Sequence, residues 1–223
     1  MVIYPTNIFL KKLWKKTVNQ DVNLLSKMYK TKTSFVYGFH GIDEEVAYQI
    51  LNNKAQFLPS RNKYDWLGSG VYFWENNLSR AKQYAVQDSK RNNSKIKTPF
   101  VLGAILDLGN CFDLLEQENL DFLACTFEEL DYTCKAENMP LPENKSFYPE
   151  DFDLKKRELD CAVIRLALQI AKQNGVIFDS VRAVFWEGKE LYPNAGFKKH
   201  NHIQIAIINP DCIKGIFLPR EKQ

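Results

Sequence analysis

The last third of the chain constrains the fold more than any other part. Apolar segments at about 181–186, 201–208 and 212–218 alternate like strands, and no helical pattern separates them. A doubly wound parallel sheet needs a crossover helix between successive strands. The chain is therefore expected to be α+β with an antiparallel-rich sheet, and this order argues against a Rossmann enzyme.

Helices are expected upstream of these strands. Leu159, Val163, Leu166 and Ile170 recur at steps of four, three and four, which predicts a helix ending at Gly175. Further helices are expected after the cap residue Asp43, after Asn76-Asn77 and over 114–137, further strands over 34–39, 70–75 and 101–108, and surface loops over 91–98 and 140–150.

Size and composition indicate an ordinary globular protein. The 223 residues are 45% hydrophobic and 26% charged, which suits a single domain over residues 1–223, with 1–33 as an N-terminal helical extension. The net charge of +3 is too small to indicate nucleic-acid binding by itself. The five cysteines form no CxxC pair, so reduced thiols are expected.

The beginning of the chain gives an expectation about location. Its lysines follow a short apolar stretch, which is the wrong order for a signal peptide, and no apolar run approaches membrane-spanning length. A cytoplasmic protein without membrane contact is expected. Lys11, Lys12, Lys15 and Lys16 form either a solvated helix face or a contact for an acidic or nucleic-acid partner.

Three segments could carry chemistry, and the first reads YGFHGID. Alternation places Val36, Gly38 and His40 on one face of a strand, with His40 at the strand end before a glycine. Backbone groups beside a glycine can approach a ligand closely. His40 is therefore a candidate ligand-binding residue, and a structural histidine beside a turn is the alternative.

The second segment reads LGSGVYFWE and runs into a helix. Gly68 and Gly70 would let a ligand or another strand approach, and Tyr72 and Trp74 share a face with Gly70. An aromatic ring beside the space left by a glycine makes a slot for a flat ligand ring, which Tyr84 could close from the side. The alternative is that Tyr72 and Trp74 are ordinary core aromatics.

The third segment reads HIQIAIINPDCIKGIFLP. Its isoleucines line one strand face and His202, Gln204 and Ala206 the other, so the polar pair lies on an exposed sheet face or a cleft wall. His200 and His202 would point the same way from a strand, which leaves a metal site open if a third ligand converges.

Taken together, the motifs FHG, DWLGSGVYFWE, VFWEG and HIQIAIINPDCIKGIFLP resemble the ADP-ribosyltransferase catalytic domain of the diphtheria-toxin and poly(ADP-ribose) polymerase type, and more narrowly a bacterial branch of that superfamily. The resemblance spans about residues 35–219. It implies a split, antiparallel-rich sheet with flanking helices. Any one motif is weak, but several in the right order are more specific.

The resemblance also implies residue roles around NAD as co-substrate. His40 would hydrogen-bond a ribose hydroxyl on the adenosine side, and the Gly41 backbone would hold the nicotinamide carboxamide. Tyr72 would stack on the nicotinamide ring, with Tyr84 as the second aromatic wall, and Gly70 would leave room for the dinucleotide. No metal is implied.

One position departs from the family. The best-known transferases have a glutamate at the late catalytic position, where this chain has Gln204. An anion there favours the transition state, because positive charge develops on the ribose as the bond to nicotinamide breaks. Either Gln204 orients the ribose in an enzyme that adds single ADP-ribose units, or Glu187 or Glu75 supplies the charge. An exposed turn acid is the alternative for Glu187.

The implied activity is mono-ADP-ribosylation: transfer of ADP-ribose from NAD to a protein or nucleic-acid acceptor with release of nicotinamide, in an intracellular toxin or defence effector. An inhibitory partner protein is a further expectation of that class. The alternative is a catalytically inactive module that binds NAD or ADP-ribose.

Overall fold

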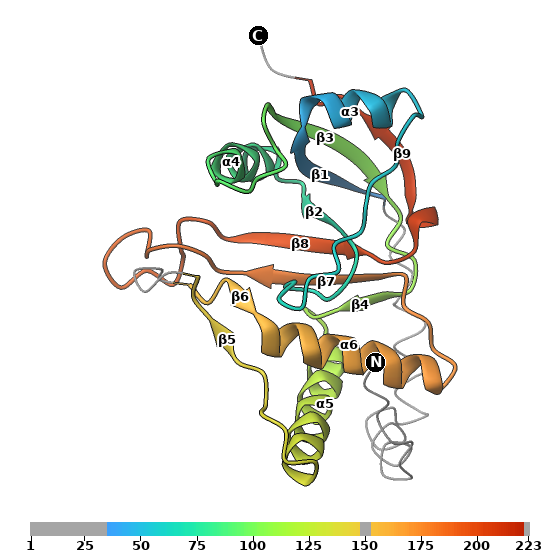
Figure 1. Ribbon diagram of the computed structural model, residues 1–223, viewed down its shortest axis with the longest axis vertical. Coiled ribbons are helices and arrows are strands. Elements are labelled where there is room, and N and C mark those ends of the chain that lie inside the picture. The colour runs from blue at the N-terminus through green and yellow to red at the C-terminus, as the bar shows by residue number, and fades with distance from the viewer. Residues whose placement is uncertain (1–34, 148–152, 221–223) are drawn as a thin grey trace.

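The fold is that of a computed structural model that describes residues 35–147 and 153–220 (Figure 1). The expected helical extension over 1–33 lies outside these residues. The elements in chain order are β1 (Val36–Asp43), α3 (Glu44–Leu51), β2 (Val71–Glu75), α4 (Leu78–Ser89), β3 (Pro99–Leu106), β4 (Cys111–Asp113), α5 (Gln117–Ala136), β5 (Asn144–Lys145), β6 (Lys156–Arg157), α6 (Glu158–Gln173), β7 (Ser180–Phe185), β8 (His202–Ile207), the 3-10 turn η1 (Pro210–Cys212) and β9 (Ile213–Phe217).

The main sheet is large and mostly antiparallel. Its strand order is β4-β7-β8-β2-β1-β3-β9, and among these described strands only the edge strand β4 pairs in parallel, with β7. A separate two-stranded ladder joins β5 and β6. Together with the four helices of the described part, this confirms the α+β class predicted from the helix-free succession of late strands.

The sheet is nearly divided in the middle. β1 pairs with β3 over eight residues and β7 with β8 over six, whereas β1 pairs with β2 only at Gly38–Glu75 and Phe39–Trp74. In Figure 1, β7 and β8 run across the view, while β1, β3 and β9 run steeply above them. β2 bridges the two halves.

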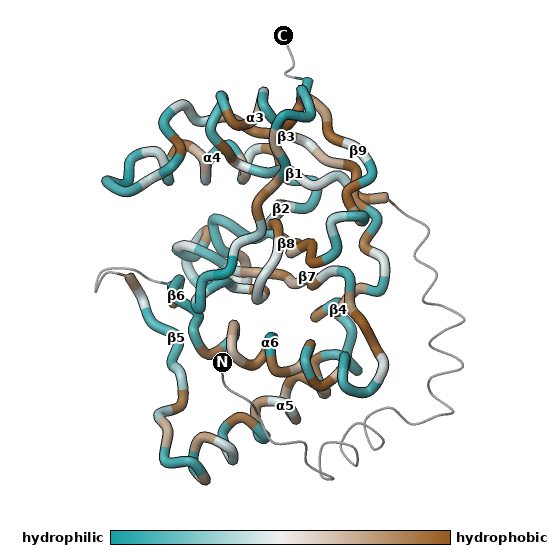
Figure 2. Tube along the Cα trace, turned by 45° about the vertical axis from the view of Figure 1, so that its right-hand side comes forward, coloured by the Kyte–Doolittle hydropathy of each residue, from teal (hydrophilic) through white to brown (hydrophobic). Residues whose placement is uncertain are grey.

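Each half has its own helices. α5 and α6 lie below β7 and β8, and α3 and α4 flank the upper half (Figure 1). The largest buried cluster joins α5 and α6 to the lower strands and includes Phe112, Leu130, Ile164 and Val181. Figure 2 shows apolar residues concentrated in β8, β4 and α6. The largest single part of the apolar core therefore lies in the lower half.

A second buried cluster crosses between the halves on the opposite face of the sheet. Phe73 of β2 is fully buried there with Leu106 of β3 and Ile205 of β8. Side-chain packing thus joins the halves where backbone pairing is short.

Local sequence signals set several helix boundaries. The Asp43 side chain accepts a hydrogen bond from Glu45 N, and the Asn77 side chain accepts one from Arg80 N, so both expected N-caps are confirmed. The predicted helix before Gly175 is α6, and Gly175 adopts φ +82°, which favours glycine just after a helix end.

Three expected boundaries need correction. The strand predicted over 34–39 is β1, which begins at Val36 and continues past His40 to Asp43, because it pairs with β3 along that whole length. The helix predicted over 114–137 begins at Gln117, because the Asp113 carboxylate accepts a hydrogen bond from Leu115 N and holds a turn before it. The surface loop predicted over 140–150 contains β5, whose Asn144 also accepts a bond from Leu159 N at the start of α6. Within residues 35–147 and 153–220, no helix is both long enough and apolar enough to cross a bilayer.

Candidate functional site

The three segments singled out in the sequence lie on neighbouring strands. YGFHGID is β1, GVYFWE is β2 and HIQIAI is β8, and these strands are adjacent in the order β8-β2-β1 at the centre of the sheet. Segments more than 100 residues apart in the chain therefore meet where the sheet divides.

His40 connects β1 to β2 by a hydrogen bond just beyond the last paired residues of the two strands. Its Nδ1 lies 2.7 Å from the carbonyl oxygen of Tyr72. A carbonyl only accepts, so Nδ1 carries the hydrogen and Nε2 is an acceptor. The half-buried ring packs against Phe57 and Phe73, and burial lowers its pKa. His40 is thus a neutral imidazole at neutral pH.

Tyr72 is directed into the protein. Its hydroxyl donates to the Gly68 carbonyl at 2.7 Å and accepts from Leu67 N at 2.8 Å. Burial raises the pKa of the phenol far above its usual value. In this structure Tyr72 packs as an interior aromatic and fixes the loop that precedes its own strand.

The glycines of LGSGVYFWE have identifiable local roles. Gly68 has φ +76°, a left-handed conformation that favours glycine. A Cβ at Gly70 would lie 2.8 Å from the Ile207 carbonyl oxygen of β8. The space beside Gly70, which was expected to accommodate a dinucleotide, is occupied here by the neighbouring strand.

Gly41 lies against α4. A Cβ at Gly41 would lie 2.8 Å from the Ala81 carbonyl oxygen and 3.0 Å from Cδ1 of Tyr84. The Tyr84 and Trp74 rings contact each other, with centroids 4.8 Å apart. Gly41 and Tyr84 are therefore neighbours, and the second ring against Tyr84 is Trp74 rather than Tyr72.

Gln204 lies on the same sheet face as this aromatic pair. It is half-buried in β8, directly opposite Trp74 of β2 on one side and Ala183 of β7 on the other. By the alternation along β1 and β2, His40 projects from the other face with Phe73. A ligand contacting both His40 and Gln204 would have to cross the sheet where β1 and β2 separate.

Glu187, just after β7, belongs to a buried ion pair. Its Oε2 lies 2.6 Å from Nη2 of Arg80 in α4, and both side chains are more than nine-tenths buried. The same oxygen lies 3.8 Å from Nδ1 of His202. The alternative of an exposed turn acid is therefore wrong. His202 is buried too, which excludes an exposed sheet face there.

The two late histidines are neutral. Burial lowers the pKa of His202 and of His200, and the charge of Arg80 lowers both further. Nδ1 of His202 lies 2.8 Å from the His200 carbonyl oxygen, which places the hydrogen on Nδ1. Within the described ranges, no three His, Cys, Asp or Glu side chains are grouped as metal ligands would be.

Sequence reasoning missed Arg80, which contacts both Glu187 and Trp74 at this site. It pairs with Glu187, 107 residues away, and its Cζ lies 5.8 Å from the Trp74 ring centroid. The available signal was helical spacing, because Arg80 and Tyr84 are one turn apart on α4. The side of α4 that carries Tyr84 therefore also carries a buried cation.

Trp66 and Arg157 were also missed. Arg157 Cζ lies 4.3 Å from the Trp66 ring centroid, and the rings of Trp66 and Phe185 lie near the ring of His202.

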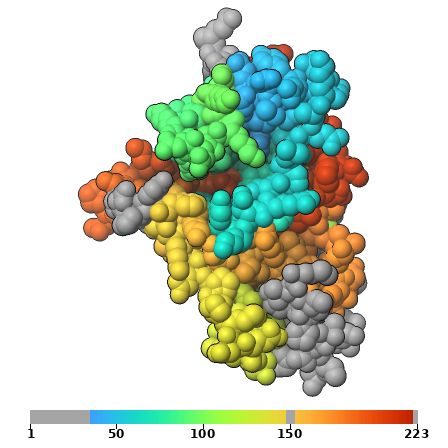
Figure 3. Space-filling view, in the orientation of Figure 1, coloured from blue at the N-terminus to red at the C-terminus, as the bar shows by residue number. Residues whose placement is uncertain are grey.

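In Figure 3, red atoms of the late strands are set back between the green atoms of α4 and the teal and yellow atoms below them.

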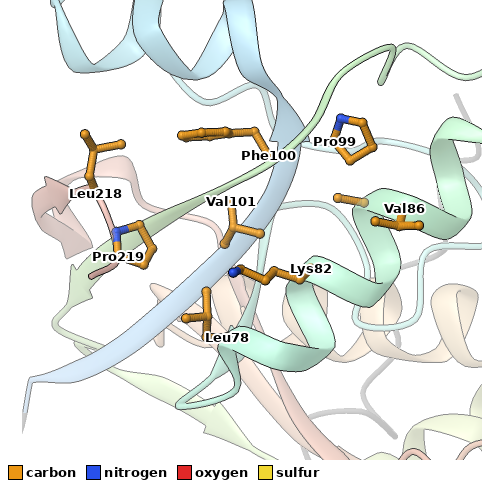
Figure 4. Close-up of a pocket in the computed structure, with 9 residues that line it drawn as sticks. Leu78, Lys82, Val86, Pro99, Phe100, Val101, Leu218 and Pro219 are labelled. Carbon is orange, nitrogen blue, oxygen red and sulfur yellow. The ribbon is translucent and has the colours of Figure 1, made fainter. Parts of the chain in front are cut away.

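An apolar groove of about 390 Å³ lies along a different side of α4 (Figure 4). Leu78, Lys82 and Val86 of α4 face Phe100 and Val101 of β3 across it. Neither Arg80 nor Tyr84 lines this groove, so it is separate from the candidate site.

Comparison with known proteins finds a partial sequence match. No protein-family model matches the chain, and no solved structure matches it. An uncharacterized protein of Methanocaldococcus jannaschii is 31% identical over 83 residues, which is 36% of this chain and 38% of that protein. The chain thus aligns with less than two-fifths of this relative's length.

Proposed function

We propose that the protein transfers single ADP-ribose units from NAD to a macromolecular acceptor and releases nicotinamide, using an ADP-ribosyltransferase-like split sheet. The supporting observation is the adjacency of β1, β2 and β8. The three motif-bearing strands are neighbours where the sheet divides, with His40 tied to Tyr72 across the division.

In the proposed complex, NAD lies across the point where β1 and β2 separate. His40 Nε2 contacts the adenosine ribose, and the nicotinamide end lies near Gly41, Tyr84 and Gln204. The glycosidic C1′–N bond breaks and its electron pair leaves with neutral nicotinamide. An acceptor nucleophile then bonds to C1′ and loses a proton. The acceptor is a protein or nucleic acid inside the cell.

Charge at the site favours a slow reaction. Gln204 is neutral, and the Glu187 carboxylate is already paired with Arg80. A free carboxylate about 4 Å from the ribose at an effective dielectric near 20 would contribute roughly 4 kcal/mol, against about 1 kcal/mol for a neutral hydrogen bond. The difference corresponds to about a hundredfold in rate.

A second candidate is an NAD- or ADP-ribose-binding module without catalysis. The Trp74–Tyr84 contact favours it, because this ring contact partly fills the proposed nicotinamide site. Both candidate acids are also paired already, Glu187 with Arg80 and Glu75 with Arg182.

The test is to incubate the purified protein with NAD labelled in the nicotinamide ring, alone and with cell extract. Released nicotinamide is measured for the wild type, His40→Ala and the exposed control Lys54→Ala. Release should fall roughly tenfold in His40→Ala, as loss of one ribose hydrogen bond predicts, and stay unchanged in the control. If the protein binds NAD but releases no nicotinamide under any condition, the transferase is rejected and the binding module is supported. Absence of binding would reject both functions.

A further inference from the structure

Buried polar atoms without partners are concentrated around the Arg80–Glu187 ion pair. Nine buried side-chain nitrogen or oxygen atoms lack a hydrogen-bond partner in the described part of the chain, and five of them belong to Trp74, Arg80, His200 and His202. Native proteins leave few such groups, because each one costs free energy. Their clustering needs an explanation that the proposed nicotinamide site does not give.

Arg80 is the centre of the cluster. Nη2 donates to Glu187, while Nε and Nη1 have no hydrogen-bond partner among the described residues, although Arg80 keeps only 8% of its surface exposed. It lies in the first turn of α4, where the helix dipole adds positive potential. Nε1 of Trp74, whose ring lies under the guanidinium, is a further donor without a partner among the described residues. Together these N–H groups match an acceptor-rich anion.

His202 contributes a hydrogen-bond acceptor to the cluster. Because its Nδ1 donates to the His200 carbonyl, Nε2 of the neutral ring is an acceptor, and it is buried without a partner in the described ranges. The same ring is linked to the ion pair, since its Nδ1 lies 3.8 Å from the Glu187 oxygen that binds Arg80. An acceptor in the same cluster as several donors suits a ligand that has a hydroxyl next to its anionic group. A ribose that bears a phosphate combines the two.

We propose that this cluster is a binding site for the phosphate-bearing ribose of a nucleotide, with Arg80 as the phosphate ligand. The inference rests on the proposed function in that NAD would be the natural source of this group. The phosphate oxygens accept from Arg80 and Trp74, and a ribose hydroxyl donates to Nε2 of His202.

Access to the cluster depends on the connection between β7 and β8. Its apolar side chains Trp186 and Phe197 are 62% and 60% exposed, so they contribute little packing against the body of the protein. Gly188 N donates to Asp153 at 2.7 Å, and Glu187 pairs with Arg80. Outward movement of this connection would separate Glu187 from Arg80 and break the contacts of Gly188 and Lys198 with Asp153, but it would lose little apolar packing and would admit the ligand.

The test measures binding of ADP-ribose, which lacks nicotinamide and cannot be turned over, by titration calorimetry. Arg80→Gln alone would leave Glu187 buried and unpaired, so the main variant is the charge-neutral pair Arg80→Gln with Glu187→Gln. Arg80→Lys keeps the charge. Lys82→Gln, which removes a cation from a different side of the same helix, is the matched control. Circular dichroism and a melting curve check folding.

We expect the double variant to bind ADP-ribose at least about tenfold more weakly, as loss of a charge-assisted hydrogen bond predicts. Lys82→Gln should bind like the wild type, and Arg80→Lys should retain part of the affinity. Inorganic pyrophosphate should compete with ADP-ribose and adenosine should not. Either of two results would reject the binding site: wild-type affinity in the folded double variant, or no binding of ADP-ribose by the wild type. The Arg80–Glu187 ion pair would then only stabilise the fold.

Two results distinguish the absence of this phosphate site from the absence of transferase activity. Arg80-dependent binding of ADP-ribose without cleavage of NAD supports this site and rejects the transferase. Cleavage of NAD with a KM unaffected by the double variant supports the transferase and rejects this site.

Discussion

Tyr72 shows how one hydroxyl group can fix a loop. Its oxygen satisfies the Leu67 N–H and its hydrogen satisfies the Gly68 carbonyl, so the loop before β2 closes onto the strand that it enters. Tyr72→Phe leaves both backbone groups without this partner. We expect a loss of about 1–3 kcal/mol in the free energy of unfolding, measured by urea denaturation. The exposed Tyr37→Phe should change the free energy of unfolding by less than about 0.5 kcal/mol. A loss just as small for Tyr72→Phe would show that the Tyr72 hydroxyl is dispensable.

Gln204 sets the expected rate of the proposed reaction. Gln204→Glu places a carboxylate on the face that carries Trp74 and Tyr84, and it should raise nicotinamide release roughly a hundredfold through stabilisation of the charged ribose. Gln87→Glu makes the same chemical change on an exposed part of α4 and should leave release unchanged. A folded Gln204→Glu protein with no gain in rate would remove Gln204 from the reaction.

Residues with local partners were the ones that sequence reasoning could identify. Asp43 and Asn77 cap helices that begin next to them, and their roles follow from residue type and position. Arg80 could not be identified in this way, because Glu187 is brought to it only by the tertiary fold. The projection of His40 and Gln204 from opposite faces likewise depends on strand pairing, which no single segment encodes.

At the scale of elements, α4 and β1 pack as closely as a glycine permits. Gly41→Ala would place a methyl group 2.8 Å from the Ala81 carbonyl oxygen, so α4 must shift. We expect a loss of about 1–3 kcal/mol in stability, measured by thermal or urea unfolding. Gly196→Ala is the matched control, since no atom of the described residues lies within 4 Å of the position that its new methyl group would take and its φ is not left-handed. A neutral Gly41→Ala would show that the two elements are loosely packed.

The Asp43 carboxylate joins α3 to the segment before β3. It accepts from Glu45 N, Lys97 N and Thr98 N, and these backbone bonds, that of Thr98 first, lower its pKa below the usual 3.8. A lowered folded-state pKa stabilises the protein above the unfolded value, and this contribution is lost as the pH falls through the folded pKa.

The prediction is a pH-dependent difference between the wild type and Asp43→Asn. The wild type should be the more stable at about pH 6, and the difference should shrink as the pH falls below about 4, where the carboxylate gains a proton. Urea midpoints across this range measure it. A difference that is constant with pH would mean that the charge of Asp43 is immaterial.

The periodicity of apolar residues predicted which segments are helices and strands better than it predicted which strands pair with each other. The recurrence of apolar residues in α6 and the alternation in β8 predicted those elements within a few residues. The parallel pairing of β4 with β7 and the short β5–β6 ladder were not predicted, because two or three residues carry no periodic signal.

For the whole molecule, the two halves of the sheet depend on packing at their junction. Phe73 is fully buried in the cluster that joins β2, β3 and β8, and its ring contacts those of His40 and Phe57. Phe73→Ala should cost about 3–5 kcal/mol in the free energy of unfolding, measured by urea denaturation. Phe127→Ala, on the partly exposed side of α5, should cost far less. A loss under about 1 kcal/mol at Phe73 would mean that the junction repacks freely.

The short edge strand β4 affects how copies of the chain meet. Unpaired backbone groups at a sheet edge are templates for aggregation. β4 offers three residues to an incoming strand, and at the opposite edge β9 carries the exposed Lys214 and is followed by Pro219, which has no amide hydrogen to donate. The sheet therefore gives a neighbouring molecule little to extend, and concentrated solutions should resist fibril growth by strand addition.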